Sequence, residues 1–205
     1  MVSTSLLESA VDQFGRLGFE GASTRDIARA SGTAMSSITY HFGGKHGLYL
    51  ATAEHIGTQV LAALQPLLDT LPGEDAPREE TLEAMLALID RLAGVMLDPR
   101  SERWAQFVIR EQQQPTEAFE RLYEVAMQHI AAALLTLMSR LRPDLQGRDL
   151  PAKGLLLIGQ AMILRAGRAS VCRALGVDQL GADEIALMRA HLRANALAIL
   201  SENPR

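Results

Sequence analysis

The chain has 205 residues, of which 48% are hydrophobic and 4% aromatic, and its formal net charge is −4. That length is enough to bury a sizeable core. The negative balance argues against a protein that coats nucleic acid over its whole surface, although a local DNA-binding surface remains compatible with it. The single cysteine, Cys172, excludes an intrachain disulfide.

The N-terminus lacks the basic segment and apolar core of a signal peptide, and the most apolar stretch, 154–164, is too short to span a bilayer. We therefore expect a cytoplasmic protein with no membrane partner. The basic residues are 18 Arg and two Lys, a bias that we attribute to genomic base composition.

The first half of the chain predicts four helices. A capping box at Ser5 and Glu8 opens the first helix, which ends at Gly18. A second capping box, Ser-Thr-Arg-Asp at 23–26, opens a short helix that stops at Gly32. A third helix covers 35–42, and a longer one runs from Lys45 at least to residue 64, where Pro66 kinks or ends it.

Five further helices are predicted after a linker rich in Pro, Gly and acidic residues at 71–79. They cover about 77–97, 101–113, 115–142, 151–175 and 182–201. No alternating strand pattern appears. The sequence therefore predicts an all-α fold of about nine helices. We expect residues 1–50 to form a three-helix helix-turn-helix domain and residues 51–205 to form a second helical domain.

The helix at 35–42 has a surface suited to a DNA groove. Its outward residues are small or polar and none is acidic, while Ile38 and Phe42 fall on the side expected to face the core. Hydroxyl and imidazole groups can contact base edges or backbone oxygens, and a basic residue at a helix N-terminus suits a phosphate. The candidate DNA-binding residues are Thr24, Arg25, Ser36, Ser37, Thr39, Tyr40, His41 and Lys45.

The same pattern is compatible with a plain helical subdomain. Residues 1–50 carry four basic and four acidic side chains, so charge alone does not identify a DNA-binding surface. A helical protein that binds small molecules without binding DNA is the alternative reading.

The segment STRDIARASGTAMSSITYHFGGKHGLYLA resembles the signature of the TetR family. The matching positions are Ser23, Ile27, Ala28, Ser31, Gly32, Tyr40, Phe42 and Lys45. The resemblance implies a homodimeric transcriptional regulator, usually a repressor, that binds double-stranded operator DNA and is released by a small molecule.

A looser resemblance links the C-terminal region to the CecR-like branch of that family. It depends on Arg110, Glu111, Pro115, Gly159, Gln160, Arg165 and Arg168. Together, the two resemblances imply that residues 1–50 form the DNA-binding domain and that residues 51–205 form a helical ligand-binding and dimerisation domain, which takes a drug-sized effector. Aromatic and apolar residues on two consecutive helices favour a pocket with a few polar groups, although an ordinary core would look alike. The candidate ligand-binding residues are Trp104, Phe107, Val108, Glu111, Phe119, Tyr123, Met127, Gln160 and Arg165.

The last two predicted helices have wide apolar faces. Two such helices from each of two subunits can form a four-helix interface, whereas packing within one chain is the alternative. The candidate interface residues are Leu155, Ile158, Met162, Met188, Leu192 and Ile199.

An enzyme is not expected. The sequence offers no catalytic residues, no Gly-x-Ser-x-Gly elbow and no phosphate loop, and it predicts no cofactor. The five histidines are scattered at spacings that do not suggest a metal site.

Overall fold

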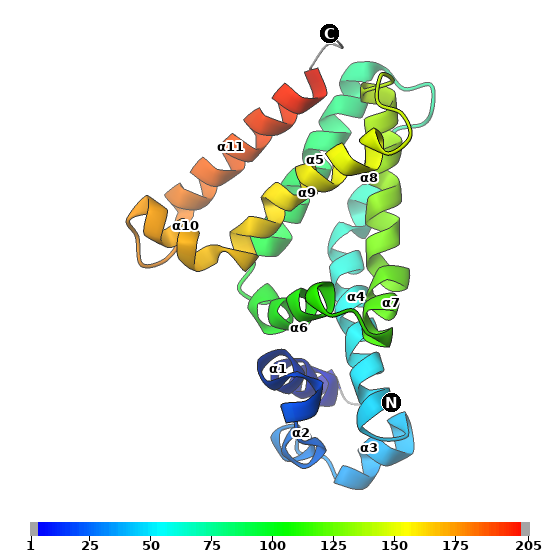
Figure 1. The fold of residues 1–205 in the computed structure, drawn as a ribbon, viewed down its shortest axis with the longest axis vertical. Helices are drawn as coiled ribbons and strands as arrows, with labels where there is room; N and C mark the ends of the chain where they lie inside the picture. The colour runs from blue at the N-terminus through cyan, green and yellow to red at the C-terminus, as the bar shows by residue number, and fades with distance from the viewer. Residues whose placement is uncertain (1–3, 202–205) are drawn as a thin grey trace. The chain divides into compact units, whose positions relative to one another are not determined.

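The computed structural model describes residues 4–201 (Figure 1). All regular secondary structure in that part of the chain is helical, which confirms the all-α prediction. The helices gather into two compact units. One contains residues up to 62 and 100–129, and the other contains 63–99 and the residues from 130 onward. The functional division at residue 50 stays a prediction, because compactness alone does not tell which residues bind DNA.

The first unit holds α1 (Thr4–Gly21), α2 (Thr24–Ala30), α3 (Met35–Phe42), α6 (Ser101–Gln113), α7 (Glu117–Leu122) and a π-helical turn, η1 (Tyr123–Met127). Helix α4 (Lys45–Leu68) starts in this unit. Helix α1 packs along α6, and an aromatic cluster fills the space between the helices. Within it, the ring of Tyr49 lies 4.9 Å from that of Phe14 and 4.8 Å from that of Phe107.

The second unit holds α5 (Arg78–Leu97), α8 (Gln128–Leu141), α9 (Asp149–Ala166), α10 (Arg168–Leu175) and α11 (Ala182–Ser201). Helix α5 packs against both α9 and α11, and α10 forms the corner between those two (Figure 1). Leu134 and Met138 of α8 are buried against Gly154 of α9.

Ten helices, rather than nine, are present in residues 4–201 when the unbroken run α7–η1–α8 is counted as one. The extra helix arises because the predicted helix at 151–175 is broken at Gly167, where α9 and α10 meet at 79°. A Cβ at Gly167 would lie 2.5 Å from Ile163 Cδ1, so a larger residue at the bend would require the Ile163 side chain to move. Periodicity could not show this break, because a helix interior also tolerates an isolated glycine.

Helix boundaries follow the sequence signals in most places. Ser23 caps α2 by accepting a hydrogen bond from the Asp26 N–H at 3.4 Å, as the second capping box predicts. The predicted cap at Ser5 is wrong, because α1 already begins at Thr4. Pro66 lies inside α4, which ends two residues later at Leu68.

Arginine side chains close several helix ends in the second unit. Arg78 donates to the carbonyls of Leu141 and Leu200, and Arg165 donates to those of Met96 and Asp98. A planar guanidinium can reach two acceptors at once, which suits the orphan carbonyls of a helix C-terminus.

By length and apolar composition, the continuous helix 117–141 could cross a membrane. The core helix of a soluble protein passes the same test, so this property is weak evidence.

Candidate functional site

The turn between α2 and α3 is held by short-range hydrogen bonds. The Ser31 hydroxyl donates to the Ala28 carbonyl at 3.1 Å and lies 2.9 Å from the Thr33 hydroxyl. Gly32 between them has a φ of +68°, a conformation that favours glycine. These contacts fix the direction in which α3 leaves the turn.

Helix α3 exposes most of the residues that the sequence assigns to DNA contacts. Tyr40 is 84% exposed, and its ring lies edge-on to that of His41 at 4.9 Å. The opposite side holds the helix in place, since Ile38 is buried. Exposed with Tyr40 are Ser36, Thr39 and His41, whereas Ser37 is half-buried.

The basic residues near α3 differ in how freely they can meet a phosphate. Arg25 is exposed, while Arg29 forms an ion pair with Asp26 at 2.6 Å. Lys45 donates from Nζ to the carbonyl of Glu20 at 3.2 Å and lies 4.8 Å from the centroid of the Phe19 ring. It therefore ties the end of α1 to the start of α4. Thr24 is half-buried in the first turn of α2.

Glu111 of α6 is a buried carboxylate, 1% exposed, that joins three elements. It accepts a hydrogen bond from the Tyr49 hydroxyl at 2.6 Å. It also accepts from the Thr116 N–H at 3.1 Å and the Thr116 hydroxyl at 2.8 Å. Burial raises the pKa of the Tyr49 hydroxyl above its ordinary value, and the hydrogen bond to Glu111 raises it further. Tyr49 is therefore a stable donor at neutral pH.

The neighbouring residue on α6, Arg110, contacts the backbone of α1. Its guanidinium donates to the Gly15 carbonyl at 3.4 Å. It also lies against Gly18, where the backbone has a φ of +72° and an added Cβ would stand 1.7 Å from Arg110 Nη1. Gly18 is where the sequence predicted the first helix to end, and one more turn follows it after this irregularity.

The predicted ligand-binding residues fall into both compact units. Trp104, Phe107 and Val108 are buried on α6. Phe119 and Tyr123 stack with centroids 6.2 Å apart, and Tyr123 is partly open to solvent at the start of the π-helical turn η1. Met127, half-buried, ends that turn.

Gln160 and Arg165 belong to the second unit and have partners there. The Asn195 amide donates to Gln160 Oε1 at 2.8 Å. Arg165 donates to two carbonyls at the end of α5. Sequence spacing could not show these contacts, because the partners lie 35 and about 70 positions away.

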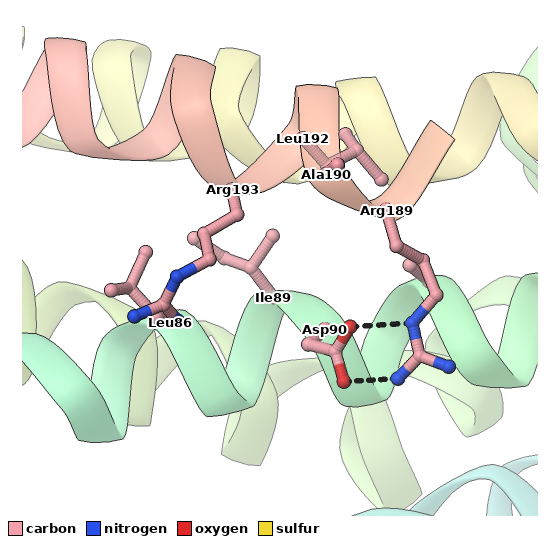
Figure 2. Close-up of a pocket in the computed structure, with 8 residues that line it drawn as sticks. Leu86, Ile89, Asp90, Arg189, Ala190, Leu192 and Arg193 are labelled. Atoms are coloured by element: carbon pink, nitrogen blue, oxygen red, sulfur yellow. Dashed lines mark hydrogen bonds and ion pairs between the residues drawn. The ribbon is translucent and has the colours of Figure 1, made fainter. Parts of the chain in front are cut away.

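The structure contains a groove of about 190 Å³ between α5 and α11 that the sequence did not predict (Figure 2). Its apolar lining includes Leu86, Ile89 and Leu192. Arg189 binds both carboxylate oxygens of Asp90 at its edge, and Arg193 pairs with Glu83 at 2.9 Å. The four-residue spacing of the two arginines on α11 was the sequence signal for this row of ion pairs.

The predicted interface residues differ in how much surface they offer. Leu155 is exposed, whereas Ile158, Met162, Met188 and Ile199 are half-buried. Leu192 is only 6% exposed, because it lies in the groove against α5. Three apolar residues outside the predicted set are also exposed: Leu156, Ile163 and Leu187.

Residues 4–201 contain no group of three or more His, Cys, Asp or Glu side chains placed to hold a metal ion.

Two family models match the chain. The model described as "Bacterial regulatory proteins, tetR family" matches residues 6–52. The model described as "HTH-type transcriptional dual regulator CecR, C-terminal domain" matches residues 81–202, more than half of the chain.

Characterised relatives and solved structures are similar to this chain. The HTH-type transcriptional dual regulator CecR of Shigella flexneri is 28% identical over 81% of this chain and 76% of its own length. The HTH-type transcriptional repressor AcnR of Corynebacterium glutamicum is 29% identical over 48% of this chain and 43% of its own length. The structure of the regulator FadR from Bacillus subtilis, in complex with stearoyl-CoA, is 15% identical with a TM-score of 0.66. That match covers 98% of each chain and supports the fold.

Proposed function

Because this chain belongs to the TetR family of bacterial regulatory proteins and carries a CecR-type C-terminal domain, it is a transcriptional regulator with a helix-turn-helix DNA-binding domain, and we propose that it acts as a homodimeric repressor in the cytoplasm. The dimer binds a two-fold operator and is released by a drug-like or metabolite ligand. Its relatives are regulators and not enzymes.

The observation that carries the proposal is the exposed, acid-free surface of α3. Tyr40 projects from it into solvent, with hydroxyl and imidazole groups on either side. Such a helix can enter a major groove without repelling phosphates and offers hydrogen-bonding groups to base edges. Arg25 and Lys45 add positive charge beside it for the backbone. A dimer would place two such helices about one turn of DNA apart.

For the ligand, we propose a site on the partly exposed aromatic pair Phe119 and Tyr123, with Met127. Support comes from the π-helical turn that contains two of these residues, since π turns recur at functional sites. Glu111 already has three donors. We therefore assign it the role of positioning Tyr49 and the start of α7, so that a ligand's effect on α7 reaches α4.

The proposal is tested by fluorescence anisotropy of the full chain on DNA flanking its own gene, measured over a series of salt concentrations. Affinity should fall steeply with salt, because binding releases counterions from phosphates. Tyr40→Ala should weaken operator binding on the order of ten-fold, since a hydrogen bond contributes about 0.5–1.5 kcal/mol and each dimer has two such tyrosines.

Gln106→Ala is the control, because it removes an exposed side chain of α6 away from the proposed contacts. Lys45→Ala should also weaken binding. It is the less clean variant, because Lys45 also joins α1 to α4. Absence of binding to every flanking fragment at low salt would overturn the proposal and favour a helical ligand-binding protein.

A further inference from the structure

The first residue of α3 is an apolar side chain left in solvent. Met35 is 51% exposed, whereas Ile38 of the same helix is buried and Phe42 is half-buried. The residue before it, Ala34, is also exposed and makes no side-chain capping hydrogen bond. Two neighbouring apolar side chains therefore lie at the N-terminal end of the helix that carries the polar candidate contacts.

Single exposed apolar side chains are common on protein surfaces and need no explanation by themselves. The position of Met35 distinguishes it. It precedes Thr39 by four residues, which places the two side chains in one row along the helix, and it is adjacent to Ser36. In a helix-turn-helix, the N-terminal residues of the second helix contact base edges.

The chemistry of Met35 restricts what it can recognise there. Its thioether has no donor and is only a weak acceptor, so it cannot form the paired hydrogen bonds that identify guanine or adenine. The C5-methyl group of thymine is the apolar group that a base pair presents in the major groove. A flexible, polarisable methionine can pack against such a methyl group and exclude water from it.

We propose that Met35, with the Ala34 methyl group beside it, reads a thymine C5-methyl group in each half of the operator. This inference rests on the proposed function and adds to it a specificity-determining residue and the base that it selects. The polar residues of α3 contact phosphates and hydrogen-bonding base edges, and Met35 supplies selectivity by apolar contact.

The test uses the full chain and an operator selected with it from flanking DNA or a random pool. Each thymidine is replaced, one symmetric pair at a time, by deoxyuridine, which keeps the base pairing and lacks only the methyl group. At the one symmetric pair that Met35 contacts, loss of each methyl group should weaken binding about four-fold, which corresponds to ~0.8 kcal/mol. Both half-sites together should give on the order of a ten- to twenty-fold loss.

Met35→Ala should clearly reduce this sensitivity, because only the small methyl groups of two alanines then remain beside the thymine. Met35→Leu should retain most of the sensitivity, because it keeps an apolar side chain of similar size. Tyr40→Ala should weaken binding by the same factor on the thymidine and the deoxyuridine operators. Circular dichroism of each variant checks that the helices are intact, which the exposed position of Met35 leads us to expect.

The outcomes separate the two proposals. If the chain binds its operator but discriminates thymidine from deoxyuridine at no position, or does so equally in Met35→Ala, the inference about Met35 is wrong and the proposed function stands. If no DNA is bound at low salt, the proposed function fails and the inference falls with it.

Discussion

A buried carboxylate such as Glu111 is costly unless donors surround it, and here three donors do so. Removing the carboxylate should leave the buried Tyr49 hydroxyl without a partner. A buried group left unsatisfied costs about 1–3 kcal/mol. We predict that Glu111→Ala lowers the free energy of unfolding in urea by that order and lowers the melting temperature accordingly. Glu120→Ala, an exposed change on α7, is the control and should have little effect. Equal stability of the two variants would contradict the prediction.

The raised pKa of Tyr49 predicts an alkaline loss of stability. The unfolded chain releases the tyrosine proton above a pH of about 10, whereas the folded chain retains it. The folded state therefore binds more protons in that range, and its stability falls as pH rises, by at most about 1.4 kcal/mol per pH unit. The prediction is checked by urea unfolding of the parent and of Tyr49→Phe between about pH 8 and 11, an interval that brackets the ordinary tyrosine pKa of about 10. The parent should lose more stability than the variant, and parallel curves would refute it.

For single residues, the sequence predicted which side chains are exposed to solvent better than it predicted their hydrogen-bond partners. Tyr40 and Ser36 are exposed as expected from their places on α3. The second role of Lys45 could not be predicted, because its partner Glu20 lies 25 positions earlier. The buried hydrogen bond of Glu111 could not be predicted either, because Tyr49 lies 62 positions away and the sequence indicates Glu111 only as a polar group of a pocket.

Helix ends are where the elements of the second unit are joined. Arg142, which is buried, donates to the carbonyl of Ile199 near the end of α11 and holds both carboxylate oxygens of Asp144. We predict that Arg142→Lys makes the last turn of α11 exchange its amide hydrogens faster and lowers the melting temperature. A lysine ammonium cannot reproduce the planar two-sided contact.

The control for that prediction is Arg193→Lys, because the pair between Arg193 and Glu83 is exposed and such pairs contribute little. If the exchange rates of the final turn are the same in both variants, the capping role of Arg142 is wrong.

Element boundaries were predictable where a side chain or a glycine acts locally. Ser23 begins α2, as the second capping box predicts, and α3 covers the predicted residues 35–42 and ends at Gly43, which has a φ of +72°. The bend at Gly167 was missed because it depends on contacts and not on composition alone. The misplaced cap at Ser5 shows that a capping-box pattern can occur inside a first turn.

At the scale of the whole molecule, the exposed apolar surface of α9 and α11 predicts self-association. Leu156 is 72% exposed, and Leu155 and Ile163 lie near it on the same helix. We predict that Leu156→Glu shifts the protein from dimer to monomer in sedimentation equilibrium and weakens operator binding. Its helix content should not change, because the side chain contributes little to the core.

A matched substitution on α8, Ala132→Glu, is also exposed and lies outside the proposed interface. It should leave the dimer intact. A Leu156→Glu protein that remains fully dimeric would place the interface elsewhere. Periodicity showed that α9 and α11 are widely apolar, but not which side faces solvent. That depends on α5, which covers Leu192 from about 100 positions earlier in the chain.

Trp104 is the only tryptophan of the chain, and it is buried on α6, the helix that also carries Arg110 and Glu111. Its indole emission therefore comes from a single known place. A compound that disturbs α6 would shift that emission in the unlabelled protein, even in the absence of DNA. The chain thus contains a built-in optical reporter with which effectors can be screened before any operator is known.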